Sequence, residues 1–419
     1  MTQNKLPKDW KWIKLGEVVD MQSGVAFKKA EYSKEGVRLF QIANVSFNYT
    51  KWEDVEHLPI GYLESHNHLL LKKGDIVLAL NRPMLNNQLK IAELKQSDVP
   101  AILYQRVGRF TFANSLNKRY FLYYFQSPIF LKWLGEQLQG VNIPFINKSK
   151  LLSYNRFPLP PFETQQLIVS KIEELFSELD KGIEDLKLAQ QQLKTYRQCV
   201  LKYAFEGKLT NKKVKDGVLP KGWEFVTIGD VCYNVEYGSG TKSKKKGRIP
   251  VLRMGNIQNG IFDWSDLVYS DDDIEINKYL LKKNDVLFNR TNSAELVGKT
   301  AIYKGERPAI FAGYLIRLNR IEELLDAAFI TYYLNSKQAK KHGNAVRSFG
   351  VNQSNINGTK LKAYPLSLPP LEEQHLIVEE IESRLSVADK MEESISQSLL
   401  QAESLRQSIL KKAFSGELV

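Results

Sequence analysis

Apolar residues recur at helical spacing in two long stretches of the chain. They step by threes and fours, which predicts helices over about 163–205 and 372–414. The first stripe comprises Ile168, Ile172, Leu175, Leu179 and Leu193. The second comprises Ile377, Ile381, Leu385, Ile395, Leu405 and Ile409. Because a seam of this length needs a partner, we expect each helix to pack on the other. Packing of the stripes on the protein's own globular core is the alternative.

Outside these stretches the apolar runs are short and are broken by Gly, Asn and Pro. Strand-like runs such as GDIVLAL and DVLFNR are mixed with brief helical ones, as expected for α+β domains. The pattern predicts four segments. They are a first globular domain (1–158), a central long helix (159–209), a second globular domain (210–367) and a C-terminal long helix (368–419).

The two halves of the chain repeat each other. LPPFETQQLIV from Leu159 returns as LPPLEEQHLIV from Leu368, a helix start with prolines followed by acids. LPKDW returns as LPKGW, and AFEG returns as AFSG. The sequence GVN opens a loop at Gly140 and again at Gly350. A repeat this long predicts two tandem, pseudo-symmetric domains rather than a solenoid.

Charge separates the globular segments from the helices. The net charge of +12 divides into +9 for 1–158, −1 for 159–209, +9 for 210–367 and −5 for 368–419. A polyanion should therefore be attracted to the domains and not to the helices. No apolar run is long enough for a membrane span, the first residues do not resemble a signal peptide, and the chain has 2 cysteines. We expect a cytoplasmic protein without a membrane partner.

Motifs of catalysis are weak in this sequence. The LPPF and LPPL stretches place Leu where an amino-methyltransferase motif needs Asn or Asp, and GSGTKSKKKGR lacks the order of a P-loop. The five histidines have no zinc-site spacing, and no nucleophile–base pair is evident. We expect no catalytic residue, metal or cofactor on this chain.

Polar residues in the loops of the basic domains suit the reading of nucleic acid. Arg matches guanine edges, and Asn or Gln matches adenine edges. We expect Asn81 and Arg82 to correspond to Asn289 and Arg290 in the repeat. The candidate DNA contacts are Gln41, Asn44, Asn81, Arg82, Asn142, Lys242, Lys244, Lys245, Lys246, Arg248, Arg253, Asn256, Asn289, Arg290, Thr291, Asn292, Asn352 and Gln353. For any one of them, a turn Asn or a surface Arg is the plainer interpretation.

Together, LPxxW, the turn KKGD or KKND before a strand, GVN…IN, LPPxxEQ and AFxG resemble the DNA-specificity subunit of Type I restriction–modification systems. The resemblance covers essentially the whole chain, and the double copy is its most specific part. It implies two target recognition domains that each read one half of a split, asymmetric DNA site. It also implies that the two long helices pack as an antiparallel coiled coil between the domains.

The resemblance further implies a non-catalytic subunit that binds double-stranded DNA. Its partners would be two modification subunits, which bind S-adenosylmethionine and methylate adenine, and two restriction subunits that use ATP and Mg²⁺. Two rival interpretations are a stand-alone DNA-binding regulatory or architectural protein and an enzyme with a hidden active site. The specificity subunit should copurify with a methyltransferase, whereas a stand-alone regulator should not. Incubating the chain alone with DNA, Mg²⁺ and S-adenosylmethionine, and looking for modified or cut product, tests the second rival.

Overall fold

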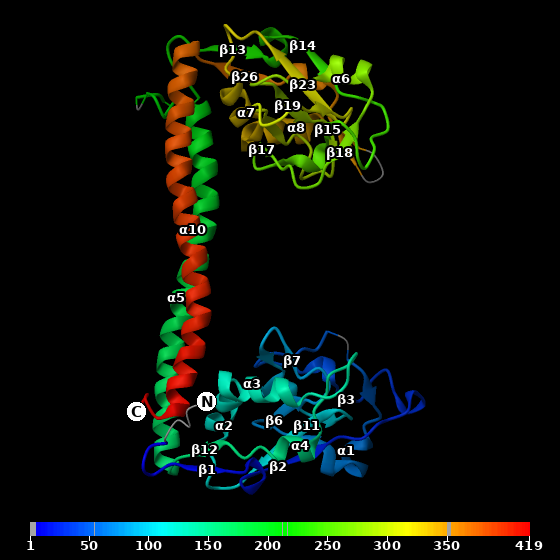
Figure 1. The fold of residues 1–419 in the computed structure, drawn as a ribbon, viewed down its shortest axis with the longest axis vertical. Coiled ribbons are helices and arrows are strands. Elements are labelled where there is room, and N and C mark those ends of the chain that lie inside the picture. The colour runs from blue at the N-terminus through cyan, green and yellow to red at the C-terminus, as the bar shows by residue number, and fades with distance from the viewer. Residues whose placement is uncertain (1–5, 54, 212, 216, 350–352) are drawn as a thin grey trace. The chain divides into compact units, whose positions relative to one another are not determined.

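Two compact units make up the structure, a computed structural model that describes residues 6–53, 55–211, 213–215, 217–349 and 353–419. Unit 1 consists of Met1–Leu186 and Gln397–Val419, and unit 2 is Lys187–Ser396. Each unit therefore holds one globular segment together with part of both long helices (Figure 1). The predicted helical segments are thus divided between the units, because each unit needs both helices to complete its core.

The long helices are α5 (Phe162–Phe205) and α10 (Leu371–Ser415), within one residue of the predicted bounds. In unit 1 the beginning of α5 shares a core with the end of α10, and in unit 2 the end of α5 shares a core with the beginning of α10. The two helices therefore run antiparallel within each unit. Arg197 of α5 pairs with Asp389 and Glu392 of α10, the latter at 2.7 Å.

The ends of the apolar stripes contribute to the domain cores as well as to helix packing. Ile168, Ile172 and Ile409 are buried in the unit 1 core, and Ile377 and Ile381 are buried in the unit 2 core. Leu175 and Leu385 are partly buried against these cores. Leu179, Leu193 and Ile395 are half-buried along the helices. Packing on the protein's own core, the alternative interpretation, thus holds for the helix ends.

Leu405 does not belong to the predicted seam, since its side chain is 51% exposed. The neighbouring Arg406 faces α5 instead, where it pairs with Asp180 and its guanidinium lies 4.4 Å from the centre of the Phe176 ring. A straight helix drifts relative to a heptad repeat, so an apolar position that fits the heptad on paper rotates away from the partner.

Unit 1 contains two four-stranded sheets, with the orders β2-β11-β6-β9 and β4-β3-β10-β5, and two smaller pairs, β1-β12 and β7-β8. The strands are β1 (Lys11–Ile13), β2 (Val19–Ser23), β3 (Val37–Phe40), β4 (His57–Leu58), β5 (Leu70–Leu71), β6 (Ile76–Ala79), β7 (Met84–Leu85), β8 (Gln88–Leu89), β9 (Ile91–Glu93), β10 (Ala101–Leu103), β11 (Val107–Phe112) and β12 (Phe157–Leu159). The helices are α1 (Tyr62–Ser65), α2 (Lys118–Phe125), α3 (Pro128–Gln137) and α4 (Lys148–Leu152).

Unit 2 repeats this plan, with the main sheet β14-β23-β19-β21 in the place of β2-β11-β6-β9. Its other described sheets are β18-β15-β22, β13-β26, β16-β17 and β20-β25-β24. The strands are β13 (Glu224–Thr227), β14 (Cys232–Tyr237), β15 (Ile249–Leu252), β16 (Ile257–Gln258), β17 (Ile261–Phe262), β18 (Val268–Ser270), β19 (Val286–Asn289), β20 (Thr291–Asn292), β21 (Thr300–Ile302), β22 (Ile310–Phe311), β23 (Leu315–Arg320), β24 (Ser348–Phe349), β25 (Ser354–Asn355) and β26 (Pro365–Leu368). The helices are α6 (Asp273–Tyr279), α7 (Ala327–Asn335), α8 (Lys337–Val346) and α9 (Gly358–Lys362).

The repeated LPP motif positions a buried glutamine that ties each long helix to its domain. Gln374 donates through Nε2 to the carbonyls of Leu324 and Pro369, at 2.8 and 2.9 Å, and its Oε1 accepts from the amide of Asp326. Gln165 makes the same three bonds in unit 1, to Ser115, Pro160 and Asn117. Both glutamines are fully buried, so they satisfy backbone groups that would otherwise be stranded.

The AFxG motif closes each unit through a glycine. Gly207 and Gly416 end α5 and α10 with φ of +72° and +80°, a backbone conformation that favours glycine. A Cβ at either position would collide with a proline ring, Pro220 in unit 2 and Pro7 in unit 1. The repeated LP and AFxG sequences are therefore two sides of one contact in each unit.

Candidate nucleic-acid interface

One end of the main sheet in unit 2 gathers four loop segments. Strands β14 and β19 end there, β23 begins there, and β25 passes beside it. The amide of Arg290 donates to the carbonyl of Tyr314 at 3.0 Å, and the amide of Ile356 donates to the carbonyl of Arg290 at 2.9 Å. This sheet end, with the loops that reach it, is called the sheet-end face below. At this face the predicted loop at Arg290 meets the segment around Ile356.

Arg290 is held on this face by an aromatic ring. Its guanidinium carbon lies 4.9 Å from the centre of the Tyr237 ring, and Nη1 donates to the carbonyl of Gly313 at 3.3 Å. The Tyr237 hydroxyl in turn accepts from the amide of Gly358 at 2.7 Å, which fixes the ring. Tyr314, beside Arg290, is 52% exposed. A guanidinium and two tyrosines on a basic domain provide charge, stacking surface and hydrogen-bond donors.

Tyr237 and Tyr314 were missed by sequence reasoning, which searched for Arg, Asn, Gln and Lys. The usable signal was position, because Tyr237 closes a strand directly before the glycines of GSG. Tyr314 similarly opens a strand after Gly313.

The basic loop after Tyr237 is only partly free. Lys244 Nζ bonds to Asp271 at 3.0 Å, and Arg248 bonds to Asp273 at 2.5 Å. The hydrogen bond from Lys244, followed by one from the backbone amide of Arg248, holds the pKa of the Asp271 carboxyl below its usual range. The other predicted members, Lys242, Lys245 and Lys246, are exposed and have no ion pair among the described residues.

Four predicted contacts are instead parts of the scaffold. Asn256 is buried, its Oδ1 accepts from the amide of Arg253 at 2.8 Å, and its Nδ2 donates to two carbonyls. Asn44 is buried in the matching loop and accepts from the amide of Gln41 at 2.7 Å. Asn289 and Thr291 are also buried, with their side chains bonded inside unit 2. Hydrogen bonds inside the units already use these buried polar groups.

The remaining predictions have mixed surroundings. Arg253 is partly exposed but pairs with Asp266 at 2.9 Å. Asn81, Gln41 and Asn292 are half-buried, whereas Arg82, Asn142 and Gln353 are exposed. Asn292 Oδ1 accepts from the amide of Ser293 at 2.8 Å. Asn352 lies outside the described residues.

The sheet register corrects the predicted match between the two repeats. Arg109 of β11 faces Val77, and Arg317 of β23 faces Leu287. Counting along β6 and β19 from these pairs places Leu80, rather than Arg82, opposite Arg290 in the repeat. The backbone bonds agree, because the amide of Leu80 donates to the carbonyl of Arg106 as that of Arg290 does to Tyr314. Identical letters were matched in the sequence, but unit 1 has two more residues before them.

Metal-ligand clusters and the Cys232 thiol bear on catalysis in the described parts of the chain. These parts contain no group of three or more His, Cys, Asp or Glu that could hold a metal ion. Burial raises the pKa of the Cys232 thiol to about 11, which opposes formation of a nucleophilic thiolate. Among the described helices, none is both long and apolar enough to cross a membrane.

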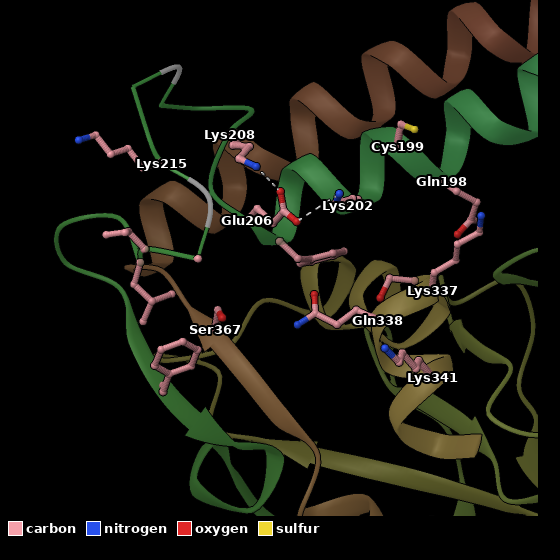
Figure 2. Close-up of a pocket in the computed structure, with 16 residues that line it drawn as sticks. Gln198, Cys199, Lys202, Glu206, Lys208, Lys215, Lys337, Gln338, Lys341 and Ser367 are labelled. Carbon is pink, nitrogen blue, oxygen red and sulfur yellow. Dashed lines mark hydrogen bonds and ion pairs between the residues drawn. The ribbon is translucent and has the colours of Figure 1, made fainter. Parts of the chain in front are cut away.

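A cavity of about 520 Å³ lies elsewhere in unit 2, between the end of α5 and the start of α8. Figure 2 shows Lys337, Gln338 and Lys341 on α8 across from Lys202 on α5 and Glu206, which directly follows α5. Glu206 bonds to Lys208 at 2.5 Å and pairs with Lys202 at 3.8 Å. The wall also contains apolar residues, namely Phe205, Val218, Leu219 and Phe225. The cavity therefore offers positive charge and apolar surface.

Comparison with known proteins gives a consistent family. Residues 7–187 and 220–401 match the Type I restriction modification DNA specificity domain. The chain is 39% identical over 211 residues to the MjaVIII specificity subunit of Methanocaldococcus jannaschii. That match covers 50% of this chain and 48% of the relative, so the chain aligns with about half of that protein.

Other similarities extend along the whole chain. The StySPI specificity subunit of Salmonella potsdam is 27% identical, over 100% of this chain and 91% of its own. A chain from a structure solved for complex assembly and conformational transition of the type I R-M system has a TM-score of 0.74 at 20% identity, covering 99% of both chains. At this identity, the structural similarity supports the fold alone.

Proposed function

We propose that this chain, which belongs to the Type I restriction modification DNA specificity family, recognises a split DNA site and directs methylation and cleavage to it. Each unit would read one half of the site with its sheet-end face. The observation that carries this proposal is the repeated design. Two globular segments with a net charge of +9 each present the same sheet end, lined with different side chains. Two different faces suit an asymmetric site.

The chemistry of modification and cleavage would belong to partner subunits. Two modification subunits would bind S-adenosylmethionine and methylate adenine, and two restriction subunits would use ATP and Mg²⁺. The duplicated units favour a pair of identical partners, because each partner could meet an equivalent surface. A cytoplasmic location follows from this role. The proposed boundaries of the recognition segments remain 1–158 and 210–367, with helical segments 159–209 and 368–419 between and after them.

The test is reconstitution from purified components. The chain, the modification subunits of its system and S-adenosylmethionine should together methylate DNA at one asymmetric split sequence, whereas the chain alone should transfer no methyl group. Mapping of methylated adenines gives the readout. Methylation by the chain alone would reveal a hidden active site. Specific DNA binding without any methyltransferase in the purified native complex would favour a stand-alone regulator.

The exposed lysines of the basic loop should govern how DNA binding depends on salt concentration rather than which DNA sequence is preferred. Replacing Lys242, Lys245 and Lys246 by Ala should weaken binding of the complex to specific and random duplexes alike. The slope of log K against log salt should fall by about 0.9 for each lysine that contacts a phosphate. Lys244→Ala is the matched control, since Asp271 already neutralises Lys244, and it should change the slope less. An unchanged slope in the triple variant would place this loop away from DNA.

A further inference from the structure

The two sheet-end faces carry an arginine in different loops, half-buried Arg290 in unit 2 and exposed Arg106 in unit 1. In unit 2, Arg290 follows β19 and its amide donates to the carbonyl of Tyr314 at 3.0 Å. In unit 1, Leu80 follows β6 and its amide donates to the carbonyl of Arg106 at 2.8 Å. The neighbouring segment also matches, because Ile146 bonds to Leu80 at 3.0 Å as Ile356 bonds to Arg290. The pair Leu80 and Arg106 thus occupies the place of Arg290 and Tyr314.

Each matched pair contains one arginine, which is Arg290 in unit 2 and Arg106 in unit 1. Leu80 is 6% exposed and contributes no polar group to the face. Arg106 is exposed at the tip of the turn between β10 and β11. In the described part of the chain, no hydrogen bond or ion pair holds its side chain. Unit 1 therefore offers a free guanidinium beside the position where unit 2 offers one stacked on Tyr237.

The backbone conformation at Arg106 is uncommon for an arginine, so its presence there calls for an explanation. Its φ is +67°, in the left-handed region where Gly or Asn is favoured and other residues are uncommon. A turn of this kind would be easier to form with glycine, so the fold does not call for arginine here. An arginine that is unfavourable for the backbone, unpaired and exposed on the candidate face is explained by a partner outside the chain.

A guanidinium is the side chain that best reads guanine, because its two parallel N–H donors match the O6 and N7 acceptors in the major groove. We propose that Arg106 reads a guanine in the half-site of unit 1, and that Arg290 does so in the half-site of unit 2. This inference rests on the proposed function and adds to it. Arg106 sets specificity in unit 1 from the turn before β11, whereas Arg290 acts in unit 2 from the loop after β19.

Tyr237 supports Arg290 as a positioning residue, and this support is missing in unit 1. The register places Ser23 where unit 2 has Tyr237, since Gly108 faces Ser23 and Ile316 faces Tyr237. Arg106 therefore has no equivalent ring beneath it. A preorganised side chain loses less freedom on binding, so we expect sharper guanine discrimination in the half-site of unit 2.

The experiment uses the reconstituted complex and DNA in which single guanines are replaced by 7-deazaguanine, which lacks N7. Arg106→Gly should lower kcat/KM for methylation about 5- to 150-fold, the range expected for one bidentate contact. The loss should be clearly smaller when the relevant guanine of the unit 1 half-site is already 7-deazaguanine, because only the O6 acceptor then remains for the guanidinium. Binding to random DNA should change little. Arg290→Ala should behave in the same way for the other half-site.

Folding is controlled within the same series. Arg106→Gly relieves the left-handed backbone, so the variant should be at least as stable as the original chain. Arg156→Ala removes an exposed arginine elsewhere in unit 1 and should leave methylation unchanged. The proposal would be overturned if Arg106→Gly weakened binding to specific and random DNA equally. It would also be overturned if the variant lost as much kcat/KM on every 7-deazaguanine substrate as on the unmodified DNA. If the original complex methylates no specific site, the proposed function itself fails.

Discussion

Exchanging residues 1–161 for the corresponding segment of a relative should change one half of the methylated sequence and leave the other half intact. Each sheet-end face is built from strands and loops of its own unit. The join is placed after residue 161, three residues beyond the proposed end of the first recognition segment. Strand β12 runs to Leu159 and pairs with β1, so a cut at 158 would divide this pair.

The exchanged segment must keep its contacts with α10. Phe414 packs edge-on against Tyr120 and Tyr124, with ring centres 5.2 and 5.0 Å apart. A donor segment with aromatic residues at both places should therefore fold onto the resident helix. Mapping of methylated adenines before and after the exchange provides the measurement. The reciprocal exchange of residues 210–370 should alter only the other half, and alteration of both halves by either exchange would contradict reading by two separate units.

Arg317→Met should lower the free energy of unfolding of unit 2 by about 3–5 kcal/mol, the cost of removing one partner from a buried ion pair. Arg317 is 12% exposed and bonds to Asp285 at 3.0 Å and to Glu236 at 2.5 Å. Its Nη1 also donates to the carbonyl of Leu280 at 3.1 Å. Without the guanidinium, two carboxylates would remain close together with little solvent.

Arg109→Met in unit 1 is the matched control for this change. Arg109 occupies the same sheet position, but its carboxylate partner Asp75 is farther away, at 3.7 Å, and neutral Gln22 stands where unit 2 has Glu236. The loss should therefore be smaller, about 1–3 kcal/mol. Hydrogen exchange of strands β11 and β23 measures both effects unit by unit. Equal losses in the two units would show that the second carboxylate in unit 2 adds nothing.

Much of the architecture was predictable because its signals are local or repeated. The bounds of α5 and α10 follow from apolar spacing and from the prolines and acids before each helix, which act within one turn. The duplication appears as matching motifs, and the basic character of the globular segments follows from counting charges. None of these inferences depends on which strand lies beside which.

The composition of the candidate face depended on contacts between distant segments. Asn256 and Asn289 have the residue type expected for reading DNA, but hydrogen bonds within unit 2 use their side chains. Leu80 could be matched to Arg290 only through the sheet register, since the identical letters Asn-Arg lie two residues further along in unit 1. Arg106 gained its place beside Leu80 in the same way. Such pairings join residues far apart in the chain, where backbone hydrogen bonds rather than local preferences decide which side chains stay free.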